Sequence, residues 1–328
     1  MRPRKVGDTM TIPSEPGDDR LDPSLSAIMS ERNQLTNLAY RLLGSLADAE
    51  DVIQETYARW YAMSPQQREA VESPGAWLTT VAGRICLDLL GSARARRERY
   101  VGQWIPEPLP DRTEWVGGRW GGAADPADRV TLDESVGMAF LVVLDSMTPA
   151  ERVAFILHDV FRYSFVEVAG IVGRTPGACR QLASSARRRI RASQAPAIPV
   201  AQRADIVGAF KRAWEAKDID ALVGLLASDA TATGDGGGLV GAELHPVEGA
   251  ERVARFFADR AGTAPGVAIL ECTVNGQPGL VAQQGGVTVS VLAFDVAGGR
   301  IKHIWAVLNP DKLRLWTTGT GSPGGDAV

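Results

Sequence analysis

The first third of the chain repeats its apolar residues at helical spacing. Residues 25–43 place leucines and other apolar side chains three or four positions apart, and Gly44 follows where such a helix would end. Residues 48–61 predict a second helix, with acidic side chains in the first turn, where the helix dipole favours them. The polar stretch 63–75 predicts a loop. Ser73 and Pro74 then supply the cap and first position of a third helix, which ends in an arginine cluster at 94–99.

Residues 164–191 have the pattern of a helix-turn-helix. Ser164 stands three residues before Glu167, which is the spacing of a capping box at the start of a helix. The apolar face of this first helix is predicted to be Val166, Val168, Ala169 and Val172. Gly173 makes a tight turn, after which Thr175 can cap the second helix and Pro176 can begin it.

The second helix of this motif has one apolar face and one basic face. Its apolar positions recur four, three and four residues apart, at Cys179, Ala183, Ala186 and Ile190. From Arg174 to Arg191 there are six arginines and no acid, in a chain whose formal net charge is −4. A basic helix is often only solvated, but two capped helices around a glycine turn fit recognition of the DNA major groove better. The pattern therefore predicts a DNA-binding protein.

A linker and two supporting helices precede this motif. Residues 102–127 are rich in Gly, Pro and Trp, and Trp104 and Ile105 stand among prolines in the sequence 104–108. Because a flexible spacer has no need of such apolar anchors, this segment is expected to dock on a surface in an extended form. Residues 132–147 predict a helix, and Thr148 and Glu151 form the capping box of the next one.

The pattern changes after a proline-bearing linker at 195–200. Amphipathic helices are predicted at 206–214, 219–226 and 253–257. Strands are predicted at 267–274, 286–296 and 300–308, with a hairpin turn at 297–299. Helices followed by a curled antiparallel sheet predict an α+β domain.

Length and composition limit the remaining possibilities. With 328 residues and 45% apolar content, the chain is expected to form three domains. It contains no apolar run of eighteen residues and no signal-peptide pattern, so we expect a cytoplasmic protein. The three cysteines, Cys86, Cys179 and Cys272, are far apart and lie in apolar patterns, which predicts core thiols and argues against a disulfide framework and a zinc site. We expect no cofactor.

The sequence AEDVIQE, the later AWLTTVAGRICLDLL with its arginine cluster, and the helix-turn-helix together resemble bacterial sigma factors of the extracytoplasmic function (ECF) type. The resemblance covers roughly residues 25–191. It implies two all-α domains, sigma region 2 at 24–100 and sigma region 4 at 129–194, joined by a linker at 101–128. It also implies that the protein binds core RNA polymerase and directs initiation at specific promoters.

The same resemblance implies residue roles. It assigns docking on the clamp helices of the polymerase β′ subunit to Asp48, Asp51, Gln54 and Glu55. Melting of the minus-ten element falls to the loop 63–75 and to Trp77, Arg84, Asp88, Arg94, Arg96 and Arg97. Aromatic and cationic groups suit this task, although Trp77 taken alone favours core packing. Reading of the minus-thirty-five element falls to Thr175, Arg180, Gln181, Ser184, Arg187 and Arg188, in a region that would also contact the β flap. Gly83 and Gly91 interrupt the third helix for no reason that the sequence reveals.

Residues 210–238, with the late strands, resemble the SnoaL-like branch of the NTF2-like superfamily, a cone-shaped α+β fold. Sigma factors that carry such a domain form the SigJ type, and three of its motifs occur here, at 104–108, 235–238 and 309–313. The implied arrangement is a linker at 195–202, a SnoaL-like domain at 203–316 and disordered tails at 1–23 and 317–328. Leu239 stands where the group usually has lysine, so a contact made by that lysine is not carried over.

The C-terminal domain is either a regulator or an enzyme. Catalytic candidates are Asp235, Glu243, His245 and His303, but no spacing specifies a catalytic pair. On the last strand Ile301, His303, Trp305 and Val307 are expected to share one face. A lone histidine on such a face is more often structural than catalytic. The alternative to a sigma factor is a helix-turn-helix regulator fused to a catalytic domain or to one that binds a small molecule.

We therefore predict a protein without enzymatic activity, whose C-terminal domain replaces a separate anti-sigma factor. A small-molecule ligand in the cone is a further possibility. The predicted interdomain residues are Trp104, Pro106, Glu107, Pro108, Asp235, Gly236, Gly237, Gly238, Asn309 and Asp311. Among them, Gly237 and Trp104 are expected to meet, because a glycine lets another segment approach closely.

Overall fold

A computed structural model describes residues 23–97, 100–110, 137–193, 198–243, 245–260 and 266–317, with the side chains of 23–30, 93–97 and 317 excepted. Residues 1–22 and 318–328 of the tails expected at 1–23 and 317–328, the linker residues 111–128 and the first part of the helix expected at 132–147 lie outside these ranges. Among the described residues, no helix is long and apolar enough to cross a membrane.

The N-terminal helices follow the sequence pattern closely. They are α1 (Pro23–Leu43), α2 (Leu46–Ala62), α3 (Pro65–Glu69) and α4 (Pro74–Arg97). Gly44 ends α1 with a positive φ of 71°, and its N–H donates to the Tyr40 carbonyl. The expectation of a plain loop at 63–75 was wrong. Ser64 and Gln67 form a capping box there, and Pro65 begins the short helix α3.

Residues 137–193 form the second set of helices. These are α7 (Met138–Asp145), α8 (Pro149–Phe155), the π-helical turn η1 (Ile156–Val160), α9 (Phe165–Val172) and α10 (Pro176–Ser193). The capping boxes at Thr148 and Ser164 are confirmed, and Gly173 adopts a φ of 68° between α9 and α10. All four apolar positions expected on α10 are buried.

Val166 does not belong to the apolar face of α9. Its side chain is 71% exposed, and the buried positions are Val168, Ala169, Ile171 and Val172. Val166 stands two residues before Val168, which is roughly 200° around the helix axis, so it points away from the core.

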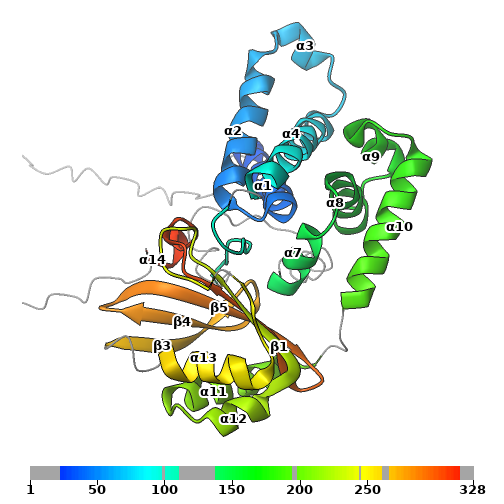
Figure 1. The fold of residues 1–328 in the computed structure, drawn as a ribbon. Helices are drawn as coiled ribbons and strands as arrows, with labels where there is room; N and C mark the ends of the chain where they lie inside the picture. The colour runs from blue at the N-terminus through cyan, green and yellow to red at the C-terminus, as the bar shows by residue number, and fades with distance from the viewer. Residues whose placement is uncertain are drawn as a thin grey trace, which may run out of the picture.

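The two sets of helices share one hydrophobic core. It contains leucines of α1, residues of α2 and α4, and the buried faces of α8, α9 and α10. Figure 1 shows α8 and α9 beside α4, with α10 at the outer edge.

The C-terminal domain combines helices with a six-stranded sheet. Its helices are α11 (Val200–Glu215), α12 (Ile219–Leu225), α13 (Ala250–Arg260), the 3₁₀ turn η2 (Pro310–Lys312) and α14 (Arg314–Thr317). Its strands are β1 (Leu226–Asp235), β2 (Val247–Glu248), β3 (Val267–Val274), β4 (Gln277–Gln284), β5 (Val287–Ala297) and β6 (Arg300–Val307), in the order β2-β1-β6-β5-β4-β3. The α+β class is confirmed.

The sheet is mixed, so the expectation of an antiparallel sheet needs correction. β1 pairs with β6 in parallel, with Thr233 opposite Trp305, whereas the other neighbouring strands are antiparallel. The pattern missed β1 because its sequence is small and polar. It missed β4 because Pro278 and Gly279 usually interrupt strands. Gly279 is required there, since a Cβ would lie 2.7 Å from the Leu292 carbonyl oxygen.

The two faces of this sheet have different partners. Figure 1 shows α11, α12 and α13 covering one face. The aromatic rings of Phe210, Trp214, Phe257 and Phe294 pack together on that side. On the other face, Trp305 and Val307 form a separate core with Ile105 of the linker and Met138 of α7. The sheet therefore packs against both the linker and the helical part of the chain.

Candidate functional site

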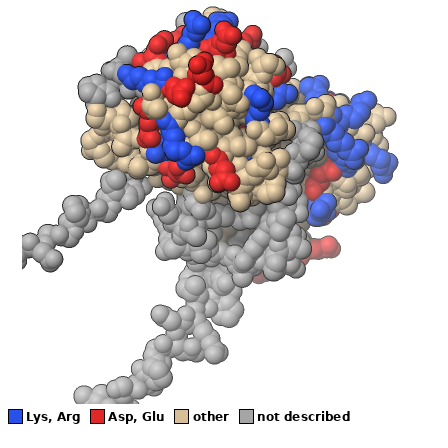
Figure 2. All heavy atoms as spheres, turned by 90° about the horizontal axis from the view of Figure 1, so that it is seen from below, with Lys and Arg blue, Asp and Glu red and all other residues tan. Residues whose placement is uncertain are grey.

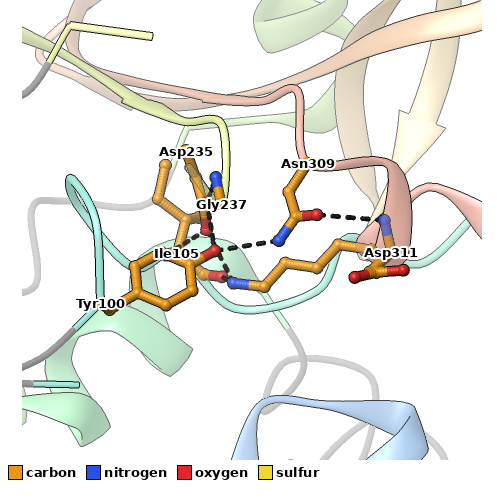
Figure 3. Close-up of polar contacts among 7 residues, drawn as sticks. Tyr100, Ile105, Asp235, Gly237, Asn309 and Asp311 are labelled. Atoms are coloured by element: carbon orange, nitrogen blue, oxygen red, sulfur yellow. Dashed lines mark hydrogen bonds and ion pairs between the residues drawn. The ribbon is translucent and has the colours of Figure 1, made fainter. Parts of the chain in front are cut away.

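The linker residues 100–110 meet the C-terminal domain around one buried carboxylate. Asp235, the last residue of β1, is fully buried. Its carboxylate accepts hydrogen bonds from Tyr100 Oη (2.6 Å), Ile105 N (2.9 Å), Gly237 N (3.0 Å) and Lys312 Nζ (2.7 Å). Figure 3 shows Tyr100, Ile105 and Gly237 gathered around Asp235. With Asn309, these residues are called the Asp235 site below: Tyr100, Ile105, Asp235, Gly237, Asn309 and Lys312.

Lys312 supplies the positive charge of the Asp235 site. It is only 8% exposed, and its ammonium also donates to the Ile105 carbonyl. The ammonium lies 4.3 Å from the ring centre of Trp104 and 5.4 Å from that of Tyr100, so two aromatic faces add cation–π attraction. A buried ion pair is stable only when such further contacts replace water.

Asn309 and Tyr100 complete the network. The Asn309 amide donates to Tyr100 Oη (2.9 Å), and its oxygen accepts from the backbone N–H of Asp311 (3.0 Å). Burial, together with the hydrogen bond to Asp235, raises the pKa of Tyr100 well above its usual value. Tyr100 therefore remains a protonated donor at neutral pH.

The glycine loop after Asp235 has no room for side chains. Gly237 has a φ of 63°, and a Cβ there would collide with the side-chain amide of Asn309. A Cβ at Gly238 would lie 3.0 Å from Val101 of the linker, and Gly236 turns too tightly against the Val240 carbonyl to admit one. The nearest neighbour of a Cβ at Gly237 is thus Asn309, and the expected meeting of Gly237 with Trp104 stays a prediction.

Trp104 lies against the helical part of the chain. A Cβ at Gly44 would lie 2.7 Å from the Trp104 ring and 3.4 Å from Pro106. The positive φ at the end of α1 places a glycine where this large ring needs space. The linker's apolar anchor is therefore seated between Gly44 and Lys312.

Glu107 joins the linker to the start of α2. Its carboxylate accepts from Leu46 N (2.8 Å), its own N–H donates to the Gly44 carbonyl (2.8 Å), and its carbonyl accepts from Tyr40 Oη (2.7 Å). Burial raises the pKa of Glu107 to about 7, against the opposing effects of the Leu46 N–H and of the nearby charge of Lys312. Glu107 thus provides one of the orphan N–H groups of α2 with a partner.

The other end of the linker is held by the sheet. Asn275, in the turn between β3 and β4, exchanges two hydrogen bonds with Leu109 and donates a third to Tyr40 Oη (3.0 Å). The Pro108 carbonyl accepts from the indole N–H of Trp316 (2.9 Å). A single stretch of chain therefore contacts the end of α1, the start of α2 and the C-terminal domain.

Most predicted interdomain residues are brought together here, but Asp311 is not. Its side chain is exposed and pairs with Arg314 at 2.8 Å. Sequence reasoning missed Tyr100, Asn275 and Lys312. Lys312 is the one cation of the C-terminal motif at 309–313, and this position could have indicated that it belongs to the site. Asn275 precedes a glycine in a hairpin turn, and only its turn geometry was readable from the sequence.

The predicted polymerase-docking face lies on the outside of α2. Asp51, Gln54 and Glu55 are exposed, and Asp48 is half-buried in the first turn. Glu55 forms an exposed pair with Arg59 at 2.8 Å.

The residues predicted to meet the minus-ten element lie along α4. Trp77 is half-buried and packs on Trp60, with ring centres 5.2 Å apart. Arg84 and Asp88 are exposed, but the Arg84 guanidinium also donates to the Gly170 carbonyl of α9 (2.8 Å). Arg94, Arg96 and Arg97 belong to α4, with side chains outside the described set.

The residues predicted to read the minus-thirty-five element lie on α10. Thr175, Arg180, Gln181, Ser184 and Arg188 are exposed, and the Thr175 hydroxyl accepts from the N–H of Ala178. Figure 2 shows basic side chains gathered at the side of the molecule where α10 lies, whereas both signs are interspersed over the C-terminal domain.

Several arginines of α10 have partners within the domain, among them Arg189, which donates to the Ser146 carbonyl (3.1 Å). Arg187 is half-buried and pairs with Asp159 of η1 at 2.6 Å. The Arg180 guanidinium stands over the Phe165 ring at 5.3 Å.

The four catalytic candidates do not converge. Asp235 pairs with Lys312, Glu243 pairs with Arg260 (3.0 Å), His245 is exposed and His303 hydrogen-bonds Thr231 (2.7 Å). Burial lowers the pKa of His303. In the described part of the chain, no group of His, Cys, Asp and Glu could hold a metal ion.

Ile301 does not share the face of His303 and Trp305, as the strand pattern had predicted. An irregularity in the pairing of β5 with β6 shifts it into the helix-covered core. Cys86 and Cys179 are buried, as expected, and Cys272 is half-buried.

Two helical regions and an α+β domain, joined by a linker that contacts both, define a two-region sigma factor with a C-terminal extension. Residues 27–96 match the family model of sigma-70 region 2, and residues 137–190 match that of sigma-70 region 4. The chain is 38% identical to the ECF RNA polymerase sigma factor SigJ of Mycobacterium tuberculosis, over 89% of this chain and 92% of the relative. It is 34% identical to a probable ECF sigma factor, SigI, of the same species, over 89% and 95%.

The crystal structure of Mycobacterium tuberculosis SigJ matches with a TM-score of 0.66 at 33% identity, over 88% of this chain and 97% of that one. The protein belongs to the ECF RNA polymerase sigma factors and is of the SigJ type. It therefore directs transcription initiation, with core RNA polymerase and promoter DNA as its partners. The family is non-enzymatic, in agreement with the prediction.

Proposed function

We propose that the C-terminal domain regulates the sigma regions through the Asp235 site, in place of a separate anti-sigma factor. The observation that carries this proposal is the buried carboxylate of Asp235, which belongs to the C-terminal domain but is bound by Tyr100 and Ile105 of the linker. The same linker contacts Gly44 and Leu46 in sigma region 2. Any shift of the C-terminal domain therefore changes how the linker holds region 2.

The buried ion pair makes this contact sensitive to single changes. Removing one partner of a buried pair leaves the other charge without compensation and typically costs about 3 to 5 kcal/mol. Docking at the Asp235 site should therefore be close to all-or-none, which suits a switch between two arrangements.

Run-off transcription with core polymerase tests the regulation. Lys312→Met should release the C-terminal domain and change initiation, because Asp235 stays buried without its cation. Adding Asp235→Asn should restore part of the wild-type behaviour, because both charges are then gone. Arg314→Met is the matched control, since Arg314 is exposed two residues away. If Lys312→Met releases the domain but initiation is unchanged, the C-terminal domain has no regulatory role.

We also propose residue roles in the sigma regions. Asp48, Asp51, Gln54 and Glu55 dock on the β′ clamp helices, α4 meets the minus-ten element, and α10 reads the minus-thirty-five element while region 4 contacts the β flap. The exposed acidic face of α2 supports the first role.

Charge reversal on α2 tests the docking role. Asp51→Lys with Glu55→Lys should abolish co-purification with core polymerase, because the docking face changes sign. Asp259→Lys, on the exposed end of α13, is the control for charge alone. Undiminished binding of core polymerase by the α2 variant would refute the docking assignment.

A further inference from the structure

One edge of the six-stranded sheet is long and carries no residue that would prevent further pairing. The sheet ends at β2 on one side and at β3 on the other. β2 has only two residues, whereas β3 has eight and pairs with β4 along its whole length without a shift in register. The sequence VAILECTV contains no proline and no lysine, which proteins commonly place on edge strands to block pairing with other chains. Among the described strands, none pairs with the outer side of β3.

The turn from β3 to β4 determines which backbone groups of β3 point outward. Asn275 and Gly276 have φ values of 52° and 73°, as a two-residue type I′ turn requires, and the pair Val274–Gln277 flanks them. Because the two residues of that pair bond to each other, every second residue back along β3 also bonds to β4. The residues between them direct their N–H and C=O groups away from the sheet: Val267, Ile269, Glu271 and Thr273.

Leu270 lies at the open rim of a hydrophobic core. Its side chain is 45% exposed, although Val281, directly opposite on β4, is only 6% exposed and packs in the core of Trp305 and Val307. Ala268, on the same face of β3, is exposed as well. An apolar side chain placed opposite Leu270 on a further strand would therefore extend this core.

We infer that two copies of this chain associate through their β3 strands, which pair antiparallel about a two-fold axis at Leu270. In this register Leu270 lies opposite Leu270 of the partner subunit. Ile269 lies opposite Glu271, the one charged residue of β3, so no two like charges meet. Val267 lies opposite Thr273, and every outward N–H and C=O group then has a partner. Because β3 is complementary to itself in this way, a second copy is the strand that fits this edge.

The β3 edge lies away from the sigma helices that are proposed to meet DNA and polymerase. Figure 1 shows β3 on the side of the sheet remote from α10, with α2 at the opposite end of the molecule. Association through β3 therefore leaves both helices accessible. The inference goes beyond the regulatory role proposed above and does not depend on the Asp235 site.

Sedimentation velocity of the full-length protein tests the association. Between about 1 and 100 μM, the wild type should change from monomer to dimer. Leu270→Lys places two like charges opposite each other at the axis and should raise the dimer dissociation constant at least about tenfold. Ile219→Lys is the matched control, because Ile219 is also an exposed apolar residue of this domain but begins α12 on the helix-covered face. A monomer at every concentration, or equal dimerisation of the wild type and Leu270→Lys, would overturn the inference.

A proline tests whether the contact is made by the backbone. Glu271→Pro removes an outward N–H and none of the hydrogen bonds to β4, and prolines are tolerated on edge strands in that orientation. This variant should lose dimerisation. Glu271→Gln, which keeps the N–H, should dimerise like the wild type, and circular dichroism checks that both variants are folded. Undiminished dimerisation of folded Glu271→Pro would exclude pairing through β3.

A disulfide tests the register, in a Cys272→Ser background that removes the native thiol of the strand. Leu270→Cys should link two copies on mild oxidation, because opposite residues of a non-hydrogen-bonded pair have Cα atoms about 4.5 Å apart, within the range for disulfides. Glu271→Cys is the control, since this neighbouring exposed position lies opposite Ile269 and should not link. Equal cross-linking of the two variants, or cross-linking of neither, would contradict a two-fold axis at Leu270.

Discussion

The glycines at 44, 83 and 237 lie where a second segment comes too close for a side chain. Their neighbours are Trp104, Ile171 and Asn309, each far away in sequence. Gly44 and Gly237 also have positive φ values, which other residues adopt only with strain. An added Cβ atom at any of these positions would therefore keep two distant segments of the chain from meeting as they do.

Gly237→Ala should weaken docking at the Asp235 site, because its Cβ meets Asn309 and its backbone has positive φ. We expect the free energy of unfolding, measured with urea, to fall by about 1 to 3 kcal/mol. Gly241→Ala, which has open space around its Cβ and no positive φ, should stay within about 0.5 kcal/mol of the wild type. Equal stability of the two variants would mean that the glycine loop accommodates a Cβ at position 237 without strain.

Glu107 should make stability depend on pH. Because its folded-state pKa of about 7 lies above its usual 4.5, the folded protein binds the proton more tightly than the unfolded chain does. Its contribution is fully present below pH 4.5 and is lost as pH rises through 7, to a total of at most about 3 kcal/mol.

Urea unfolding between pH 5 and 8 measures this effect. Glu107→Gln keeps an acceptor for the Leu46 N–H but cannot ionise. The variant should therefore gain stability relative to the wild type as pH rises. A difference between the two proteins that does not change with pH would contradict the assignment.

At the scale of elements, the residues of α10 have different roles according to their face and their position along the helix. Its apolar face is buried, Arg187 pairs with Asp159, and Arg189 donates to the Ser146 carbonyl, whereas Arg180 and Arg188 are exposed. Arg180 lies near the start of the helix and Arg188 near its end. Residues at the start of a recognition helix reach base edges, whereas later ones reach phosphates.

Arg180→Ala should therefore relax sequence preference at the minus-thirty-five element, at a cost of about 1 to 3 kcal/mol if its contact to guanine is bidentate. Arg188→Ala should weaken all sequences about equally and reduce the salt slope of binding by about one. Initiation on a panel of promoter variants at several salt concentrations compares the two. Identical selectivity profiles would contradict the division of roles.

At the scale of the whole molecule, the described residues form three hydrophobic cores arranged in series. One lies within the sigma helices and one under the helices of the C-terminal domain. The third joins the sheet to the linker and α7. Because the linker belongs to this middle core and contacts region 2, it couples the two larger bodies.

Trp104→Ala should uncouple these bodies, because the ring fills the space between Gly44 and Lys312. Differential scanning calorimetry should then show two separate unfolding transitions where the wild type shows one. Trp60→Ala, at a site remote from the linker, should lower the transition temperature without splitting it. A split in both variants, or in neither, would show that Trp104 is not the coupling residue.

Local sequence determined much of the secondary structure. The capping boxes at Ser164 and Thr148 and strand β3 formed where they were predicted, because their signals lie within a few residues of each other. β1 could not be predicted in this way. Its small polar residues become a strand only because β2 and β6 supply hydrogen-bonding partners on both sides.

The Asp235 site, too, was predictable from the sequence in part and depends on the tertiary structure for the rest. The sequence by itself determined that Asp235, Asn309 and Glu107 belong to motifs of the SigJ type, and that a linker joins sigma region 2 to the helix-turn-helix of region 4. Only the tertiary structure decided that Asp235 pairs with Lys312 and that Trp104 lies on Gly44. The physical reason is that a motif specifies side chains and local turns, whereas burial and the choice of partner depend on segments that the fold brings together from far apart in sequence.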